Sequence, residues 1–260
     1  MDKAGTTSLR IAIVGGGPAG SLFALHALEY AARARREVSI TIFEPKDFRQ
    51  PGRPGCNMCA GIVPTSVLDQ FGDLGLTVPP DLILGHVDSY SLHTATCILR
   101  AKQPNPRARI ITVYRGAGPR YGYPTGSVGF DGLLLDEAVS RGARLRRATV
   151  QAIRRSQPVE IVLAGESEHY DLAVLATGVN CDLPTLEGFG YRPPPKRSMC
   201  QTELFLGADE VRQRLGTAVH IFLPPNEIAV YGILIPKGPF VTASLLGARD
   251  QMRGMRQFLE

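Results

Sequence analysis

The chain has 260 residues, of which 44% are hydrophobic and 20% charged, and its formal net charge is +5. This balance is typical of a globular protein with one large domain or two modest ones, and it argues against wholesale disorder. No apolar run approaches the ~18 residues that a membrane-spanning helix needs, and the scattered basic residues make nucleic acid a poor candidate partner.

The first elements form a strand–turn–helix–strand unit. The apolar run Leu9–Val14 predicts a buried strand of a parallel sheet, and the turn Gly15-Gly16-Gly17-Pro18-Ala19-Gly20 follows it. Ser21–Arg36 is rich in Ala, Leu and Arg, which predicts a helix, and the β-branched run Val38–Phe43 predicts a second strand. Glu44 comes directly after this strand.

The middle of the chain alternates loops with short elements. A Pro-, Gly- and Arg-rich loop is expected over residues 46–64, and a second glycine-rich loop over residues 116–129. The helix expected at Phe130–Arg141 has Asp131 as its predicted N-cap. The other elements expected here are a short helix at Thr65–Phe71 and strands at Val87–Thr94, Thr96–Ala101 and Arg109–Tyr114.

Three successive strands are predicted next, at Arg144–Ile153, Val159–Leu163 and Tyr170–Leu175. Ala176-Thr177-Gly178 follows the last of them directly. The remaining expected elements are strands at Thr202–Leu206, Val219–Leu223, Ala229–Ile235 and Phe240–Leu245 and a helix at Arg249–Leu259.

The glycine turn has the spacing and the context of a dinucleotide-binding site. Gly15 allows a tight turn, Gly17 leaves room for a pyrophosphate, and Gly20 lets the helix pack closely on the sheet. The helix N-terminus offers unpaired N–H groups to the phosphates, and Glu44 can accept hydrogen bonds from ribose hydroxyls.

A short-chain dehydrogenase is excluded because none of the eight tyrosines has a lysine four positions further on. The segment Leu172–Gly178 resembles the second strand-and-turn motif of FAD-dependent oxidoreductases, in which the chain leaves a small β-meander and passes close to the flavin nucleotide. Thr177 and Gly178 are small enough to permit that approach. FAD is therefore the expected cofactor.

The order of the motifs resembles the geranylgeranyl reductase-like flavoproteins, within the aromatic-hydroxylase type of FAD fold. The resemblance spans nearly the whole chain and is carried by motifs at the following positions: Gly15–Gly20, Glu44, Cys59-Ala60-Gly61, Arg115, Phe130-Asp131, Leu134, Gly142-Ala143, Ala176-Thr177-Gly178 and Ile235-Pro236-Lys237-Gly238. It implies an α/β fold: a Rossmann-like FAD-binding domain with a β-meander (residues 1–85 and 112–182) and a smaller antiparallel-sheet substrate domain (residues 86–111 and 183–260).

The resemblance also implies an activity. The flavin would be reduced by a separate donor such as NAD(P)H or a ferredoxin, and would then reduce a carbon–carbon double bond of an apolar, isoprenoid-like substrate. A cytoplasmic location follows from the odd number of cysteines and the polar first ten residues, and peripheral contact with a membrane is left open.

Cys59 is the candidate catalytic residue, because family members place a cysteine followed by small residues near the reactive ring. Cys59 could position substrate at the flavin, form a redox pair with Cys56, or be an inert thiol. A lone C-x-x-C pair and histidines without metal-ligand spacing predict no metal site. Arg49, Arg53 and Arg115 are the basic residues expected near the phosphates or the flavin, and Arg115 is the best placed.

Two alternatives remain. A flavin monooxygenase or halogenase fits the fold, although hydroxylases usually carry Asp-Gly where this chain has Thr177-Gly178, and halogenases carry a tryptophan motif that this chain lacks. Family members also carry a late Gly-Asp motif, for which Gly72-Asp73 lies too early. We therefore expect the chain to be the larger N-terminal part of a longer enzyme, or else an inactive fragment that binds FAD weakly or not at all.

Overall fold

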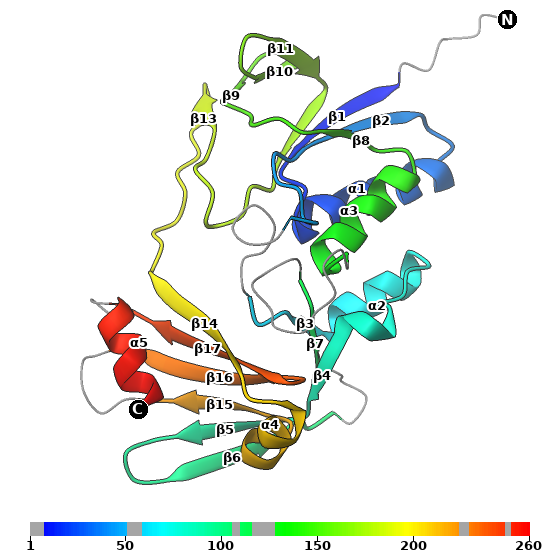
Figure 1. Cartoon of the computed structure of the whole chain (residues 1–260). Coiled ribbons are helices and arrows are strands. Elements are labelled where there is room, and N and C mark those ends of the chain that lie inside the picture. The colour runs from blue at the N-terminus through cyan, green and yellow to red at the C-terminus, as the bar shows by residue number, and fades with distance from the viewer. Residues whose placement is uncertain (1–7, 51–58, 106–109, 116–127, 224–228, 248–250) are drawn as a thin grey trace, which may run out of the picture. The chain divides into compact units, whose positions relative to one another are not determined.

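A computed structural model describes residues 8–50, 59–105, 110–115, 128–223, 229–247 and 251–260 (Figure 1). The chain divides into two compact units, which are described separately below. Unit 1 comprises Met1–Gly55 and Gly126–Pro194, and unit 2 comprises Cys56–Thr125 and Pro195–Glu260.

Unit 1 is built on a four-stranded parallel sheet with the strand order β12-β1-β2-β8. The bounds of these strands are Leu172–Leu175 for β12, Leu9–Val14 for β1, Val38–Phe43 for β2 and Arg144–Arg146 for β8. The two strands predicted at the start of the chain have the expected bounds. They are buried on both faces at their carboxyl-terminal ends, which explains why they are continuous apolar runs.

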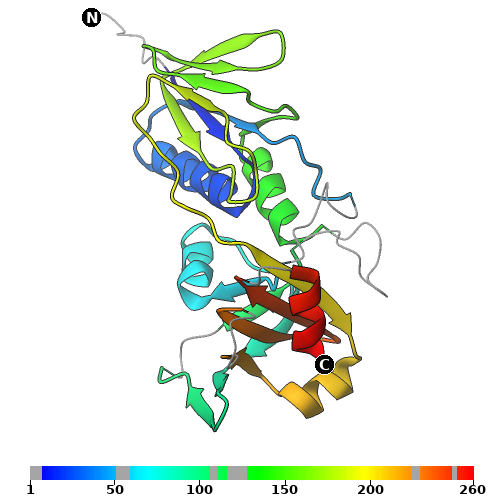
Figure 2. The same cartoon turned by 90° about the vertical axis from the view of Figure 1, so that its left-hand side faces the viewer.

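Two helices cover one face of this sheet, α1 (Pro18–Arg33) and α3 (Phe130–Ser140), and lie side by side (Figures 1 and 2). The first helix begins three residues before the predicted start, because Pro18 is suited to the first helical position. The predicted cap at Asp131 is wrong. Gly129 is the N-cap of α3, and Asp131 lies buried in the first turn.

The opposite face of the parallel sheet packs against a second sheet with the order β11-β10-β9-β13. A hydrophobic cluster joins the two, with Val14 and Phe43 on one side and Ile153, Ile161 and Tyr170 on the other. The bounds are Ala152–Arg154 for β9, Val159–Val162 for β10, Ser167–Tyr170 for β11 and Thr185–Glu187 for β13.

Two predicted strands are each divided between these sheets. The first three residues of Arg144–Ile153 form β8 of the parallel sheet, and its last two begin β9 of the meander. Likewise, Tyr170 ends β11, whereas Leu172–Leu175 is β12. The β-meander expected before Ala176 is therefore present, but it is made of β9, β10 and β11.

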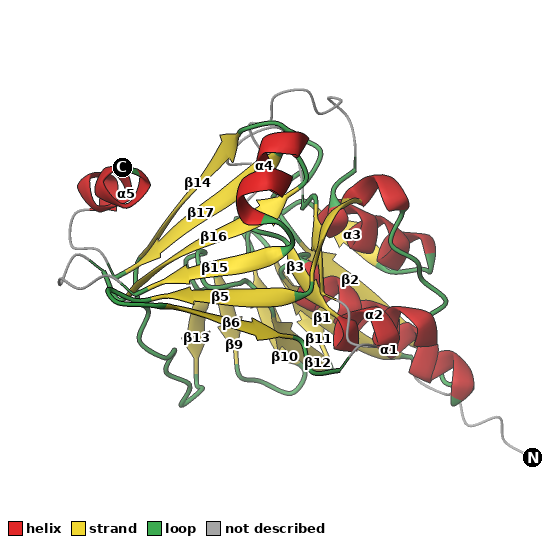
Figure 3. Ribbon diagram, turned by 90° about the horizontal axis from the view of Figure 1, so that it is seen from below, coloured by secondary structure: helices red, strands yellow, loops and turns green. Residues whose placement is uncertain are grey.

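Unit 2 contains a six-stranded sheet with the order β14-β17-β16-β15-β5-β6, whose strands Figure 3 shows in sequence. Neighbouring strands are antiparallel except β5 and β15, which are parallel. The bounds are Met199–Phe205 for β14, Phe240–Leu246 for β17, Tyr231–Lys237 for β16, Ala218–Phe222 for β15, Ser89–His93 for β5 and Ile98–Lys102 for β6.

A three-stranded antiparallel sheet of order β3-β7-β4 completes unit 2. The strands are Ile62–Pro64 for β3, Ile110–Val113 for β7 and Ile83–Val87 for β4, and the remaining helices are α2 (Thr65–Asp73), a 3-10 turn (Pro80–Leu82), α4 (Ala208–Leu215) and α5 (Gln251–Leu259). None of the helices in the described residues is long and apolar enough to cross a membrane.

The boundaries between the two units differ from the domain boundaries expected from the sequence. Residues 56–85 and 112–125, expected in the FAD-binding domain, belong to unit 2. The physical reason is a shared core. Ala60, Val87 and Ile110 pack in one hydrophobic cluster with Val219 and Ile235 of the six-stranded sheet.

Candidate functional site

The predicted cofactor-binding loops of unit 1 meet at the carboxyl ends of three neighbouring parallel strands. The Gly15 amide donates a hydrogen bond of 2.9 Å to the Phe43 carbonyl at the end of β2. The Ala176 amide donates one of 2.8 Å to the Val14 carbonyl at the end of β1. Open α/β sheets bind their ligands at this edge.

Two glycines of the turn are required by the backbone itself. Gly15 has φ of +112°, and a Cβ on it would lie 2.3 Å from the Ala176 carbonyl oxygen. A Cβ on Gly20 would lie 1.9 Å from the Gly15 carbonyl oxygen. The turn is therefore in close backbone contact with α1 on one side and with the Ala176-Thr177 segment on the other.

Gly17 is different, because a Cβ built on it meets no atom of the described residues within 4 Å. Its backbone is extended, with φ of −68°, and it is the N-cap of α1. Among the described residues no side chain caps this helix end, and the first turn of the helix contains no acidic residue. The open space therefore lies at an uncapped helix N-terminus, which is a favourable place for a phosphate.

Glu44 is held in place by two backbone amides. Its side chain accepts hydrogen bonds from the amide of Gly16 at 2.8 Å and from the amide of Lys46 at 2.9 Å, and the residue is only 7% exposed. Each carboxylate oxygen accepts one of these bonds and retains a second lone pair. The carboxylate can thus bind a hydroxyl while it stays fixed beside the turn.

Gly16 is a residue of this turn whose role the sequence motif does not reveal. A Cβ on it would lie 2.8 Å from Cβ of Glu44 and 3.2 Å from a methyl carbon of Leu135 on α3. The motif leaves this position open, so the run of three glycines was the available signal. Gly16 is what allows Glu44 and α3 to approach the turn.

Thr177 and Gly178 lie just after β12, separated from it by Ala176, and Thr177 is half-buried while Gly178 is exposed. Gly178 has φ of +79°, a conformation that favours glycine. A Cβ on Gly178 would meet no atom of the described segments within 4 Å. Gly15, Gly17, Gly20, Glu44, Thr177 and Gly178 are therefore all brought to one edge of the sheet.

Arg49 pairs with α3, because one of its guanidinium nitrogens lies 2.5 Å from a carboxylate oxygen of Asp136. Arg53 and Cys56 lie outside the described residues. The remaining candidates, Cys59 and Arg115, belong to unit 2.

In unit 2, Cys59-Ala60-Gly61 packs along β7. Gly61 has φ of +66°, and a Cβ on it would lie 2.1 Å from the Val113 carbonyl oxygen. The Val113 amide donates a hydrogen bond of 2.8 Å to the Gly61 carbonyl, and the Gly61 amide donates to the Cys59 Sγ at 3.4 Å. Arg115 comes two residues after the end of β7 at Val113 and is half-buried.

A buried ion pair also holds this segment. The ammonium of Lys237 donates to the Cys59 carbonyl oxygen at 2.8 Å and to a carboxylate oxygen of Glu203 at 3.0 Å. Their side chains are 0% and 4% exposed. The sequence singled out the motif Ile235–Gly238 but assigned no role to Lys237, and it gave no signal for Glu203.

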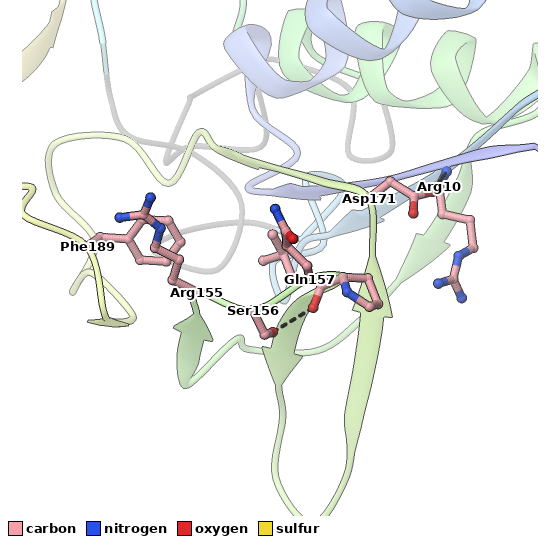
Figure 4. Close-up of a pocket in the computed structure, with 8 residues that line it drawn as sticks. Arg10, Arg155, Ser156, Gln157, Asp171 and Phe189 are labelled. Carbon is pink, nitrogen blue, oxygen red and sulfur yellow. Dashed lines mark hydrogen bonds between the residues drawn. The ribbon is translucent and has the colours of Figure 1, made fainter.

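A separate surface hollow lies in unit 1 beside the meander (Figure 4). It contains none of the predicted site residues, and the residues that line it are Arg10, Arg155, Ser156, Gln157, Pro158, Val159, Asp171 and Phe189. Within the described residues, no group of three or more His, Cys, Asp and Glu side chains could hold a metal ion.

Comparison with known protein families gives a match in the first part of the chain. Residues 12–56 match the model of a FAD-NAD(P)-binding family. A search of curated proteins finds no match.

Solved structures match over nearly the whole chain. A tryptophan C-6 flavin-dependent halogenase from taromycin biosynthesis, Tar14, covers 97% of this chain at 14% identity and a TM-score of 0.65. The fold is that of the flavin-dependent oxidoreductases.

Two further matches have the same fold. p-Nitrophenol 4-monooxygenase from Pseudomonas putida DLL-E4 covers 97% of the chain at 13% identity, with a TM-score of 0.65. The oxygenase MHPCO, as its Y270F mutant, covers 95% of the chain at 15% identity, with a TM-score of 0.61.

The chain spans 60% of the Tar14 chain, 61% of the p-nitrophenol monooxygenase chain and 61% of the MHPCO chain. The matches, together with the segment 12–56, support FAD as the cofactor. They do not single out the geranylgeranyl reductase branch.

Proposed function

We propose that this chain carries the FAD-binding core and part of the substrate domain of a flavin-dependent oxidoreductase. The observation that carries the proposal is the open space at Gly17, in a turn whose other glycines are closely packed. The packing of the protein does not require a glycine at this position. A glycine there is explained if a ligand must approach the backbone closely.

The residues at this edge of the sheet suit the parts of FAD. The N-terminus of α1, beginning at Gly17, would hold the pyrophosphate, and the carboxylate of Glu44 would bind the ribose hydroxyls. Gly15 and Gly20 shape the turn, and Thr177 and Gly178 offer a small surface for the nucleotide. Arg53 and Arg115 are proposed as further cofactor contacts.

Bound FAD supplies transfer of a hydride between its ring and a substrate. We propose that the substrate is apolar and isoprenoid-like and that a carbon–carbon double bond in it is reduced, with electrons from NAD(P)H or a ferredoxin. The resemblance of Cys59-Ala60-Gly61 to the reductase motif supports this, with Cys59 positioning the substrate. The proposed setting is cytoplasmic, with peripheral contact with a membrane where the substrate is a lipid.

A second candidate function is flavin-dependent oxygenation or halogenation of an aromatic substrate. The structural matches named above favour it, since all of them are oxygenases or a halogenase. The absence of tryptophan and of Asp-Gly at position 177 favours the reductase.

Replacing Gly17 by alanine tests the cofactor site. The added methyl group meets no atom in the part of the chain that the structure describes, so we expect the fold to be retained, at a cost of no more than about 1 kcal/mol for a poorer N-cap. The methyl group would obstruct the pyrophosphate, and the dissociation constant for FAD should rise at least about tenfold, as measured by flavin fluorescence.

The matched control is Gly72→Ala, at a position in α2 where a Cβ also meets no atom within 4 Å. This variant should bind FAD as the unchanged protein does. Equal FAD affinity of both variants, or a folded chain that binds no FAD at all, would contradict the proposed site.

The requirement for molecular oxygen distinguishes the two candidate reactions. With reduced FAD and an isoprenoid substrate under anaerobic conditions, the reductase predicts a product heavier by two hydrogen atoms in mass spectrometry. An oxygenase or halogenase predicts no anaerobic product, and oxygen uptake that increases when an aromatic substrate is added.

A further inference from the structure

We propose that Lys237 is a positioning residue that fixes the Cys59-Ala60-Gly61 segment through the carbonyl of Cys59. Only one part of this inference rests on the proposed function, namely that the Cys59-Ala60-Gly61 segment serves flavin chemistry. The contacts that fix the segment lie within unit 2 and do not depend on the proposed function.

The ion pair between Lys237 and Glu203 lies deep in unit 2. Glu203 on β14 is opposite Thr242 on β17, and Thr242 is opposite Ile235 on β16. Lys237 lies two residues beyond Ile235 on the same strand, so its side chain and that of Glu203 project from the same face of the sheet. Both side chains are almost fully buried.

A buried ion pair is a poor means of stabilising a sheet, because desolvation of the charges offsets their attraction. Two apolar side chains of similar size would hold β14 and β16 as well. The pair does something that apolar side chains cannot do, since the ammonium donates to a backbone carbonyl from a distant part of the chain. This points to a role in placing that carbonyl.

The hairpin that contains Lys237 packs closely against β4 of the three-stranded sheet. Gly238 and Pro239 form a two-residue turn between β16 and β17, and Gly238 has φ of +62°. A Cβ on Gly238 would lie 3.0 Å from the Leu84 carbonyl oxygen on β4, and one on Gly85 would lie 3.7 Å from the Gly238 nitrogen. Glycines on both sides therefore let the hairpin end lie directly against the three-stranded sheet.

The segment is thus held from two directions. Val113 of β7 binds the Gly61 backbone, and Lys237 of the hairpin binds the Cys59 carbonyl. Cys59 is half-buried, with its thiol accepting a bond from the Gly61 amide. Removing the contact from Lys237 should free the Cys59 end while β7 keeps the Gly61 end.

The test is the double variant Lys237→Met with Glu203→Met, which removes both charges and preserves side-chain volume. We expect the urea midpoint to stay within experimental error of the unchanged protein and the alkylation rate of Cys59 by iodoacetamide to rise at least fivefold. Alkylation is measured by peptide mass spectrometry, with the exposed Cys97 as the internal reference whose rate should not change.

A matched single variant, Glu203→Gln, keeps the Lys237 amine as an N–H donor to the Cys59 carbonyl, although its charge loses the neighbouring carboxylate. Its Cys59 alkylation should stay within twofold of the unchanged protein. A folded double variant with unchanged Cys59 alkylation would overturn the proposal, as would equal rates in the double and single variants.

The link to flavin is tested separately. In the FAD-bound protein, the double variant should shift the reduction potential of the flavin while the FAD dissociation constant changes less than threefold. An unchanged potential together with a released Cys59 would overturn the role in flavin chemistry. Failure to bind FAD at all would count against the proposed function, and the alkylation result would still decide the role of Lys237.

Discussion

The Glu44 side chain is fixed in one orientation by the protein itself, and this orientation suits the binding of a nucleotide. Both of its carboxylate oxygens accept backbone N–H groups, from Gly16 and Lys46, so the side chain has little rotational freedom left. A fixed acceptor loses less entropy when it binds a ligand than a mobile one does. The adjacent Gly16 has no Cβ that would push this carboxylate away.

We predict that Glu44→Gln weakens FAD binding about tenfold, or about 1.4 kcal/mol. The amide has one acceptor oxygen in place of two, and its NH2 group would face one of the two backbone N–H donors. Flavin fluorescence titration measures the effect, and Glu37→Gln, at an exposed position just before β2, is the control. Equal affinities of the two variants would remove Glu44 from the site.

A second substitution at this scale separates packing from binding. Gly20→Ala should lower the free energy of unfolding by about 1–3 kcal/mol, because its Cβ would lie 1.9 Å from the Gly15 carbonyl oxygen. Urea unfolding measures the loss. Stability equal to that of Gly17→Ala would mean that the turn adjusts more easily than its contacts indicate.

Among the elements, the parallel pair β5 and β15 joins two histidines. His93 Nε2 lies 2.9 Å from His220 Nδ1, and His220 Nε2 lies 3.1 Å from the Leu215 carbonyl oxygen. A carbonyl can only accept, so Nε2 of His220 carries its hydrogen and Nδ1 accepts from His93. The ring of His93 also stacks on Phe222, at 4.3 Å between centroids.

This contact gives unit 2 a pH dependence. The pKa of His93 is lowered from its ordinary value of 6.5, chiefly because burial disfavours the charged ring and further because His220 and Arg100 lie near it. The unfolded chain therefore binds this proton more readily than the folded one. The contribution to stability is complete above the unfolded pKa and is lost as pH falls below 6.5 toward the lowered folded value.

We expect the urea midpoint of His93→Gln to fall less between pH 7.5 and pH 5.5 than that of the unchanged protein. The exposed His169→Gln is the control and should keep the original pH dependence. Parallel curves for all three proteins would show that His93 does not titrate differently on folding.

The elements also show what the sequence could and could not predict. The strands Leu9–Val14 and Val38–Phe43 were predicted with their correct bounds, because buried parallel strands are continuous apolar runs. Arg144–Ile153 was not divided correctly, since its apolar and β-branched residues suit either sheet. The turn at Ala148, whose amide donates to the Arg146 carbonyl, carries no glycine or proline to mark it.

The same distinction applies to the candidate sites. The glycine turn is a local motif, so its residues and the packing of Gly15 and Gly20 could be predicted from spacing alone. Lys237 and Glu203 could not be paired, because their contact depends on β17 lying between β14 and β16. No local pattern encodes which strand will be a neighbour.

For the whole molecule, the proposed site requires segments that are far apart in the sequence. We predict that FAD increases the hydrogen-exchange protection of residues 9–33 and 172–178 together, because both border the same edge of the parallel sheet. At a hundredfold excess over the dissociation constant, FAD should stabilise the protein by about 2.7 kcal/mol. Protection of the first segment alone would mean that the Thr177-Gly178 loop does not contact the cofactor.

The strand order of the parallel sheet also determines when each strand can pair with its neighbours during synthesis of the chain. Strand β1 pairs with β2, which follows it closely, and with β12, which is synthesised only after most of unit 1 and the first segment of unit 2, Cys56–Thr125. Until Leu175 emerges, β1 has an open edge, and the backbone groups that later pair with β12 are exposed. The proposed site includes Thr177 and Gly178, which come after β12 in the chain, so the complete site can form only late in the synthesis of the chain.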